Sequence, residues 1–311
     1  MLVFAFVQPA LSLTATTPTA PLASSIYSLK GPPSAANLDL AKAAGIVTLW
    51  DTHAPRARPV AQWELKLFFQ AENDMQQQLG LRAQRDADKT FGSISVVMAA
   101  GVVVSNAFIS NDNPVLSSLG YLAAMLPFLV LAAGVVLPDV VQRILVTVWR
   151  WDPVYRRRQT YHEAGHFLCG YLCGLSVEGY DTATGEGASS AVRFAPSATL
   201  GDDHAAVDRL AVVSMAGVAA EVLVCGDAEG GIADVNSLRA LMSRASPPIS
   251  GRTQQDDRIR WGCLMALTLL QQRRSALDAL AEAFDASASV GECLLALESA
   301  EREGGGADSF T

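Results

Sequence analysis

The segment YHEAGHFLCGYLCG, residues 161–174, places two histidines and a glutamate within one turn of an apolar stretch that has the character of a helix. His162 and His166 are four residues apart, so on a helix both imidazoles lie on one face, with their Cβ atoms about 6 Å apart. Glu163 follows His162 directly and points to one side of the pair. Because polar side chains are costly to bury in an apolar segment, this pattern indicates a functional site.

Two imidazoles placed in this way can bind one Zn²⁺ ion, at about 2.0–2.1 Å each. Zinc lowers the pKa of its bound water to about 7, and the Glu163 carboxylate is placed to take the proton without being a ligand. This is the H-E-x-x-H arrangement of zinc peptidases. The spacer residues Ala164 and Gly165 are small and allow another helix to approach closely. The alternative is a helix whose histidines are hydrogen-bonded core residues.

A catalytic zinc usually has three protein ligands and one open position, so a third ligand must come from elsewhere. The candidates downstream are one histidine and several acids: Asp202, Asp203, His204, Glu221 and Asp234. Asp234 follows a glycine-rich turn before an expected helix, and its alternative role is to cap that helix near Val235. Glu221 lies within an expected helix, where packing or support of a ligand is an equal alternative. A solvated histidine is expected at position 204.

The composition predicts membrane content, because the 311 residues are 50% hydrophobic and only 17% charged. The net charge of −8 argues against a general affinity for nucleic acid. The five cysteines are odd in number and lack a C-x-x-C pair, so we expect reduced and mostly buried thiols. Cys169 and Cys173 share a helix face, where packing is expected and metal ligation is the alternative.

The two ends of the chain are not expected to belong to the fold. Residues 1–35 begin with a short apolar run, continue with Thr, Ser, Ala and Pro, and contain no acidic residue. This composition is typical of an organelle-targeting leader of the plastid type, and a simple disordered N-terminus is the alternative. Residues 301–311 are expected to form a disordered tail.

Residues 36–90 are expected to form a soluble helical region. Its clearest element is an amphipathic helix with apolar residues at helical spacing, namely Leu65, Phe68, Met75 and Leu79.

Residues 91–138 contain two apolar runs, which predict a transmembrane helical hairpin. The second run, 116–137, has 22 residues and no charge, enough to cross a hydrocarbon core of about 30 Å. The first run, 94–109, is short, and a buried or re-entrant helix is its alternative. Basic residues flank the hairpin on both sides, which places both flanks in one compartment. An interfacial helix is expected at 139–151.

Residues 139–300 are expected to form an all-helical zinc peptidase domain with a small β-hairpin. The hairpin is expected from two short β-prone segments, 175–180 and 191–196. Apolar stripes and start signals predict helices at 202–227, 229–245, 257–274, 275–284 and 289–300. The expected fold class is therefore mainly α: a transmembrane helical hairpin followed by this domain.

Three blocks in order, YHEAGH, VVSMAGVAAEVL and GGIAD, resemble the peptidase module of the FtsH family of membrane zinc proteases. The resemblance covers about residues 155–300, and the C-terminal pieces are similar to a plastid group of FtsH-like proteins. It implies that His162, His166 and Asp234 bind zinc and that Glu163 is the catalytic base. It also implies a plastid membrane, thylakoid or inner envelope, with the peptidase domain on the stromal side.

The chain departs from that family in having no G-x-x-x-x-G-K-[ST] motif. No nucleotide binding is therefore expected, and the family's ATPase-driven unfolding is not expected either. The predicted function is a membrane-anchored, ATP-independent zinc metalloendopeptidase that hydrolyses unfolded or damaged proteins. Its expected partners are protein or peptide substrates, the membrane, and either copies of itself or membrane protease complexes.

Two other functions remain open on sequence grounds. One is a non-proteolytic FtsH-like scaffold or adaptor, because folded substrates are hard to degrade without a motor. The other is an intramembrane protease of the site-2 class, which also places H-E-x-x-H in an apolar helix. Against the second stands the charged segment RRRQT, residues 156–160, directly before the motif.

Overall fold

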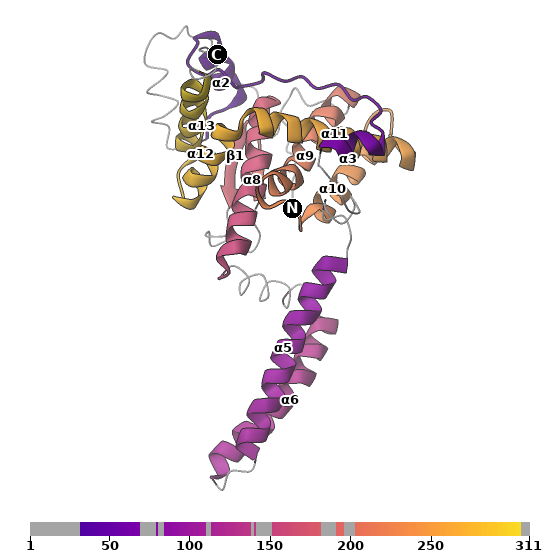
Figure 1. Ribbon diagram of the computed structural model, residues 1–311, viewed down its shortest axis with the longest axis vertical. Helices are drawn as coiled ribbons and strands as arrows, with labels where there is room; N and C mark the ends of the chain where they lie inside the picture. Colours follow the sequence, from indigo (N-terminus) through magenta and orange to yellow (C-terminus); the bar gives the residue numbers. More distant parts are fainter. Residues whose placement is uncertain are drawn as a thin grey trace, which may run out of the picture. The chain divides into compact units, whose positions relative to one another are not determined.

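The computed structural model describes residues 32–68, 79, 84–109, 113–137, 140, 151–181, 191–195 and 203–305. These residues fall into two compact units, of which one comprises Met1–Leu81 with Arg156–Thr311 and the other Arg82–Tyr155. The described part is mainly helical with one two-stranded sheet, as the sequence predicts (Figure 1). Residues 1–31 of the expected leader 1–35 and most of the expected interfacial helix 139–151 lie outside the described residues.

The first unit is built around helix α8, Pro153–Leu172, which carries the histidine motif. The helix is buried almost continuously through its second half, and it packs closely against α9, His204–Cys225. A Cβ atom at Gly165 would lie 2.5 Å from the carbonyl oxygen of Ala216, so only glycine permits this approach. The prediction that the small spacer residues of the motif admit a second helix is confirmed.

Four further helices complete the helical layer around α8 and α9. Helices α10, Gly231–Arg244, and α11, Arg252–Gln272, both pack against α9. Helices α12, Arg274–Asp285, and α13, Val290–Gly305, pack against each other. The last helix therefore extends into the segment that was expected to be a disordered tail.

The predicted β-hairpin is present as strands β1, Val177–Asp181, and β2, Ala191–Phe194, which pair antiparallel. Three aromatic rings join this hairpin to the helices. Phe167 of α8 meets Phe284 of α12 edge to face at 5.7 Å between ring centroids, and Phe284 stacks on Tyr180 of β1 at 4.0 Å. Such pairs add about 0.5–1.5 kcal/mol each beyond the burial of their area.

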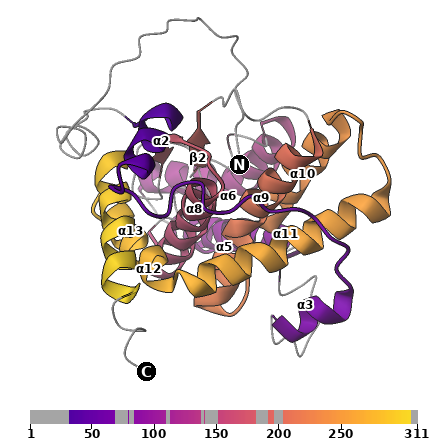
Figure 2. The same ribbon diagram turned by 90° about the horizontal axis from the view of Figure 1, so that it is seen from above.

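The described residues 32–68, which precede the predicted helical hairpin, also belong to the first unit, although residues 36–90 were expected to form a region of their own. It contains helices α2, Ala35–Ala43, and α3, Gln62–Phe68, joined by an extended stretch that crosses the helices of the core (Figure 2). The buried Glu298 carboxylate accepts hydrogen bonds from the backbone N–H groups of Thr48 and Leu49, at 2.8 and 2.9 Å. These bonds fix the extended stretch to α13.

The second unit contains helices α5, Gln84–Ile109, and α6, Pro114–Val136, which pack against each other as a hairpin. A Cβ atom at Gly120 would lie 2.6 Å from the backbone nitrogen of Ile109, so the helices approach closely near their connection. Helix α5 begins ten residues before the expected apolar run and takes in four charged residues, Arg85, Asp86, Asp88 and Lys89.

Within the described residues, no helix is both long enough and apolar enough to cross a bilayer. The predicted helical hairpin is thus confirmed, whereas the prediction that it is transmembrane is not.

Candidate metal centre

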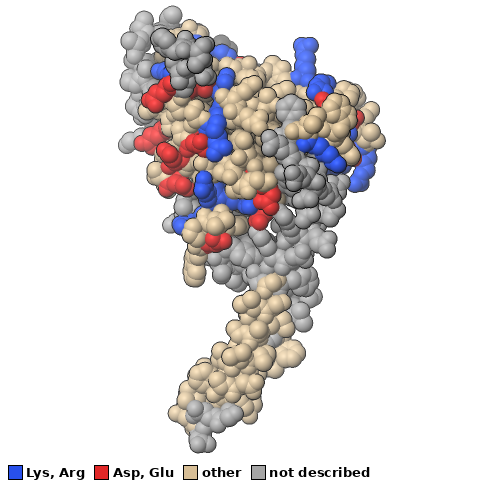
Figure 3. Space-filling view, in the orientation of Figure 1, with Lys and Arg blue, Asp and Glu red and all other residues tan. Residues whose placement is uncertain are grey.

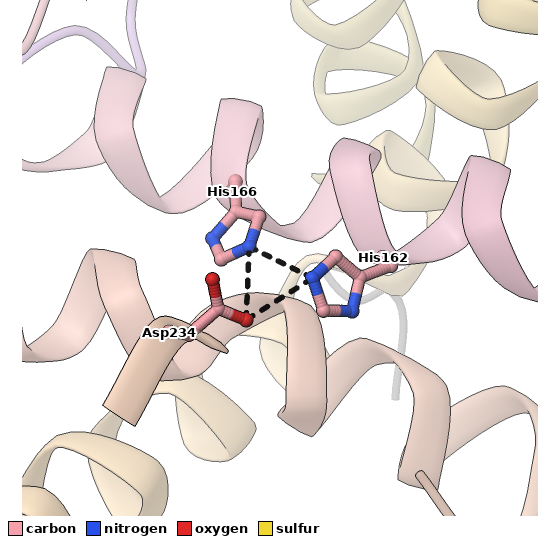
Figure 4. Close-up of side chains that lie close together, drawn as sticks. All are labelled: His162, His166 and Asp234. Atoms are coloured by element: carbon pink, nitrogen blue, oxygen red, sulfur yellow. Dashed lines mark hydrogen bonds and ion pairs between the residues drawn. The ribbon is translucent and has the colours of Figure 1, made fainter. Parts of the chain in front are cut away.

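Two helices bring the predicted ligands together at one buried point. His162 and His166 project from one face of α8, and Asp234 projects toward them from the first turn of α10 (Figure 4). The Nε2 atoms of the two histidines are 3.0 Å apart. Asp234 Oδ2 lies 3.2 Å from His162 Nε2 and 3.7 Å from His166 Nε2. All three side chains are buried, and the three facing atoms form a cluster that can hold a metal ion.

The spacing and the hydrogen bonding of these atoms both fit a metal ion. Ligands held tetrahedrally at about 2.0–2.1 Å from an ion lie about 3.3–3.4 Å apart, which falls within the range found here. Both carboxylate oxygens of Asp234 are buried and, in the described part of the chain, accept no hydrogen bond. A buried carboxylate without hydrogen bonds is costly unless a cation compensates it. A metal ion held between the three atoms would supply that compensation.

The far sides of both imidazoles are already engaged. His162 Nδ1 lies 2.7 Å from Glu221 Oε1, and His166 Nδ1 lies 2.7 Å from the carbonyl oxygen of Val213. A carbonyl and an ionised carboxylate only accept, so each Nδ1 carries the proton. In the neutral imidazole the Nε2 lone pair then faces the cluster, which is the tautomer that metal-binding histidines require.

The electrostatics of the cluster favour a positive charge at this point. Burial raises the pKa of Asp234, but the two neighbouring imidazoles outweigh this effect and hold that pKa well below its usual range. Burial lowers the pKa of His162, but Asp234 and Glu221 outweigh it and raise that pKa well above its usual value. Metal ions compete with protons for such ligands, so metal binding is expected to release a proton.

Gly217 of α9 forms one wall of the cluster. A Cβ atom at this position would lie 2.5 Å from His162 Nε2 and 2.6 Å from His166 Nε2. Any side chain here would therefore occupy the space in front of the two ligand atoms. The sequence motif that resembles the FtsH family includes this glycine, but its role follows only from the packing of α9 on α8.

Glu163, the predicted catalytic base, lies on α8 beside His162 and is 1% exposed. Gln159 Nε2 donates a long hydrogen bond of 3.4 Å to its Oε1 atom. Its role as a base stays a prediction.

Asp203 and His204, two of the other candidate ligands, have hydrogen-bond partners away from the cluster. The Asp203 carboxylate caps α9 by accepting a hydrogen bond from the Ala206 N–H at 2.8 Å. His204 Nε2 lies 3.0 Å from the carbonyl oxygen of Pro247. Asp202 lies outside the described residues. The capping alternative for Asp234 is wrong, because α10 begins at Gly231, its N-cap is Gly230, and no side chain caps it.

Sequence reasoning left the role of Glu221 open between packing, ligation and support of a ligand, and the structure places it at His162 Nδ1. It missed the Val213 carbonyl, since a backbone oxygen leaves no trace in the residue type.

The five cysteines are free, and four of them are buried, as expected. Cys169 and Cys173 are not part of the metal-ligand cluster found among the described residues. Burial raises the pKa of Cys173 to about 12, with a smaller opposing effect of Arg209 and a smaller raising effect of Asp51. The side chain is therefore an inert thiol, which supports the packing interpretation.

No family model, curated protein or solved structure matches this chain.

Proposed function

We propose that this protein is a membrane-attached zinc metalloendopeptidase that works without ATP. The observation that carries the proposal is the buried cluster of His162, His166 and Asp234, in which three ligand atoms face one point. Both imidazoles have their Nδ1 atoms engaged elsewhere, and the Asp234 carboxylate has no hydrogen bond in the described residues. In a purely structural role, only the imidazoles of His162 and His166, at 3.2 and 3.7 Å, would compensate that buried carboxylate.

Zinc is the ion that this set of donors suits best. Two imidazoles and one carboxylate are typical of catalytic zinc sites, in which three protein ligands leave one position open. When bound, zinc acts as a Lewis acid and lowers the pKa of a coordinated water to about 7.

The chain's own groups divide the remaining work. His162, His166 and Asp234 hold the ion, and the hydrogen bonds at the two Nδ1 atoms fix the orientation of the imidazoles. Glu163 is proposed to take the proton of the attacking water on its carboxylate and to pass it to the leaving nitrogen of the peptide. Burial of Glu163 keeps bulk water from competing for that proton.

Membrane attachment is proposed for the unit that contains α5 and α6. These helices expose apolar side chains along their length, including Val102, Val103, Leu119, Leu122, Phe128 and Leu129, each more than half exposed. The described atoms of this hairpin show no charged side chain in the space-filling view (Figure 3). Apolar surface of this extent is typical of a lipid or protein contact. We propose that this hairpin contacts lipid, and that the membrane is a plastid membrane with the peptidase domain on its stromal side. The leader-like N-terminus supports the plastid, and the basic residues on both sides of the hairpin support the stromal side.

The proposed substrates are unfolded or damaged proteins and peptides. The sequence lacks the glycine-rich loop and lysine that bind nucleotide phosphates, so this chain is not expected to unfold substrates with ATP. A non-proteolytic scaffold is the competing function, and it would keep the metal centre without turnover.

The test measures zinc content and casein cleavage by the full-length protein, with and without ATP. We expect close to one zinc per chain and cleavage that does not respond to ATP. Glu163→Gln should keep the zinc and lose about 10²–10⁴-fold in rate, because a general base contributes that much. Loss of zinc in this variant would contradict the role assigned to Glu163. A zinc-loaded wild type that cleaves nothing would favour the scaffold.

A further inference from the structure

Arg158 stands one helical turn before His162 on α8, and it is only partly buried. Its guanidinium NH1 group donates to Glu221 Oε2 at 3.2 Å. The other oxygen of the same carboxylate, Oε1, lies 2.7 Å from His162 Nδ1. A continuous chain of contacts therefore leads from Arg158 through Glu221 to one of the proposed metal ligands.

The same guanidinium also contacts the turn that follows α9. It donates to the carbonyl oxygen of Asp227 and, at 2.9 Å, to the Asp227 carboxylate, and it lies 3.8 Å from the Glu229 carboxylate. The backbone N–H of Glu229 in turn donates to Glu221 Oε2 at 2.9 Å. This turn leads directly into α10, whose first turn carries Asp234.

Arginine suits this position because its planar fork donates several hydrogen bonds in fixed directions. Glu221 is 2% exposed, and a buried carboxylate needs both a cation and hydrogen bonds to keep one orientation. Arg158 supplies the cation, and the Glu229 N–H supplies a second donor on the same oxygen. The remaining oxygen of Glu221 is thereby aimed at the imidazole of His162.

We infer that Arg158 is a positioning residue of the metal centre. It orients Glu221 against His162 Nδ1 and holds the turn 226–230, which leads to Asp234, close to the motif helix. The inference rests on the metal-binding part of the proposed function and not on peptidase activity. Arg158 touches neither metal nor substrate, so its effect passes through Glu221 and the turn.

The test compares Zn²⁺ affinities of full-length variants by competition with a chromophoric chelator. Arg158→Gln should weaken Zn²⁺ binding about 10–100-fold, the loss typical of residues that support metal ligands. Arg156→Gln removes the same charge from an exposed position two residues earlier and should bind like the wild type. The Zn²⁺ affinity of Arg158→Lys should lie between those of Arg158→Gln and the wild type, because an ammonium group keeps the charge but cannot donate like the planar guanidinium.

A double-mutant cycle separates positioning from a general effect on folding. In the Glu221→Gln background, Arg158→Gln should cause a smaller loss of affinity than in the wild type, because only its contacts with the turn 226–230 remain to be removed. The absorption spectrum of Co²⁺ bound in place of zinc should shift in Arg158→Gln and not in Arg156→Gln. If Arg158→Gln does not fold, Arg158→Lys carries the same comparisons.

Three results would overturn the inference. Wild-type Zn²⁺ affinity and an unchanged Co²⁺ spectrum in a folded Arg158 variant would show that Arg158 does not position the metal ligands. The proposed metal site itself would not be contradicted by that result. Equal losses in the wild-type and Glu221→Gln backgrounds would show that Arg158 does not act through Glu221. A wild-type protein that binds no Zn²⁺ would overturn the metal site itself, and the inference with it.

Discussion

At the scale of single residues, Asp234 decides whether the cluster is a metal site. Asn is close to Asp in size but is a poor zinc ligand, and no helix cap is lost, because Gly230 is the N-cap of α10. Asp234→Asn should therefore lower Zn²⁺ affinity by more than about 100-fold, beyond the loss typical of supporting residues. Metal analysis after dialysis against a weak chelator measures this loss.

Circular dichroism of the same Asp234→Asn sample serves as the control, and it should show a folded helical protein. A folded, zinc-replete Asp234→Asn protein would move the third ligand to another acid.

Gly217 provides a second prediction at this scale. In Gly217→Ala the added methyl group would stand about 2.5 Å from the Nε2 atoms that face the ion, so we expect Zn²⁺ binding to be lost. Overpacking also lowers the free energy of unfolding, by about 1–3 kcal/mol. Isothermal titration with Zn²⁺ and thermal unfolding of the metal-free protein measure the two effects.

Gly251→Ala is the matched control for Gly217→Ala. Gly251 is the N-cap of α11, its added methyl group would lie 3.4 Å from the Gln254 side chain, which is ordinary contact, and its φ of −69° is open to alanine. This variant should bind Zn²⁺ with nearly wild-type affinity. Equal Zn²⁺ affinities of the Gly217→Ala protein and the wild type would mean that α9 moves away from α8 far enough to make room for the methyl group.

At the scale of elements, the extended stretch between α2 and α3 depends on Glu298 of α13 for its attachment to the helices of the first unit. Its carboxylate is 1% exposed and accepts hydrogen bonds from Thr48, Leu49 and the Tyr171 hydroxyl. Glu298→Gln places an amide donor against these donors, and a buried unsatisfied group costs about 1–3 kcal/mol in addition to the lost bonds. We expect the free energy of unfolding to fall by about 2–4 kcal/mol, measured by urea denaturation.

Glu303→Gln on the same helix is the control, because Glu303 is exposed, and it should change stability by less than about 0.5 kcal/mol. Limited proteolysis should then cut Glu298→Gln near residues 46–60 faster than the control. Equal stability of the two variants would show that the stretch is held by its apolar side chains, Val47, Leu49, Trp50 and Val60, which are buried as well.

At the scale of the whole molecule, the exposed apolar surface of α5 and α6 predicts binding to lipid. The full-length protein should float with phosphatidylcholine vesicles in a density gradient. Burying one leucine side chain contributes about 1.5–3 kcal/mol, so exchanging Leu119, Leu122 and Leu129 together for Asn should remove about 4.5 kcal/mol or more and leave most of the protein unbound.

The control for this flotation experiment is Leu67→Asn, which changes a leucine of α3 that is 69% exposed and lies in the other unit. This variant should float like the wild type. A wild-type protein that stays at the bottom of the gradient would contradict lipid binding by the hairpin.

Local patterns made the elements predictable. Helix boundaries followed from signals such as the apolar stripe that predicts a helix at 202–227, where the structure has α9, His204–Cys225. The β-hairpin followed from two β-prone runs around a turn. The place of residues 35–68 was not predictable, because the contact between Thr48 and Glu298 joins positions far apart in the chain.

The sequence by itself determined the pair of His162 and His166, since helical periodicity alone puts residues four apart on one face. It narrowed the third ligand to a few residues, and the family resemblance selected Asp234 among them. Only the tertiary structure decided that Asp234 lies close to the Nε2 atoms of both histidines. It also decided that Glu221 and the Val213 carbonyl contact the two Nδ1 atoms. The absence of a side chain at Gly217 leaves open the space in front of the two Nε2 atoms. The physical reason is that these contacts depend on how α9 and α10 pack against α8. A packing distance is set by the whole core and not by the spacing of residues along one helix.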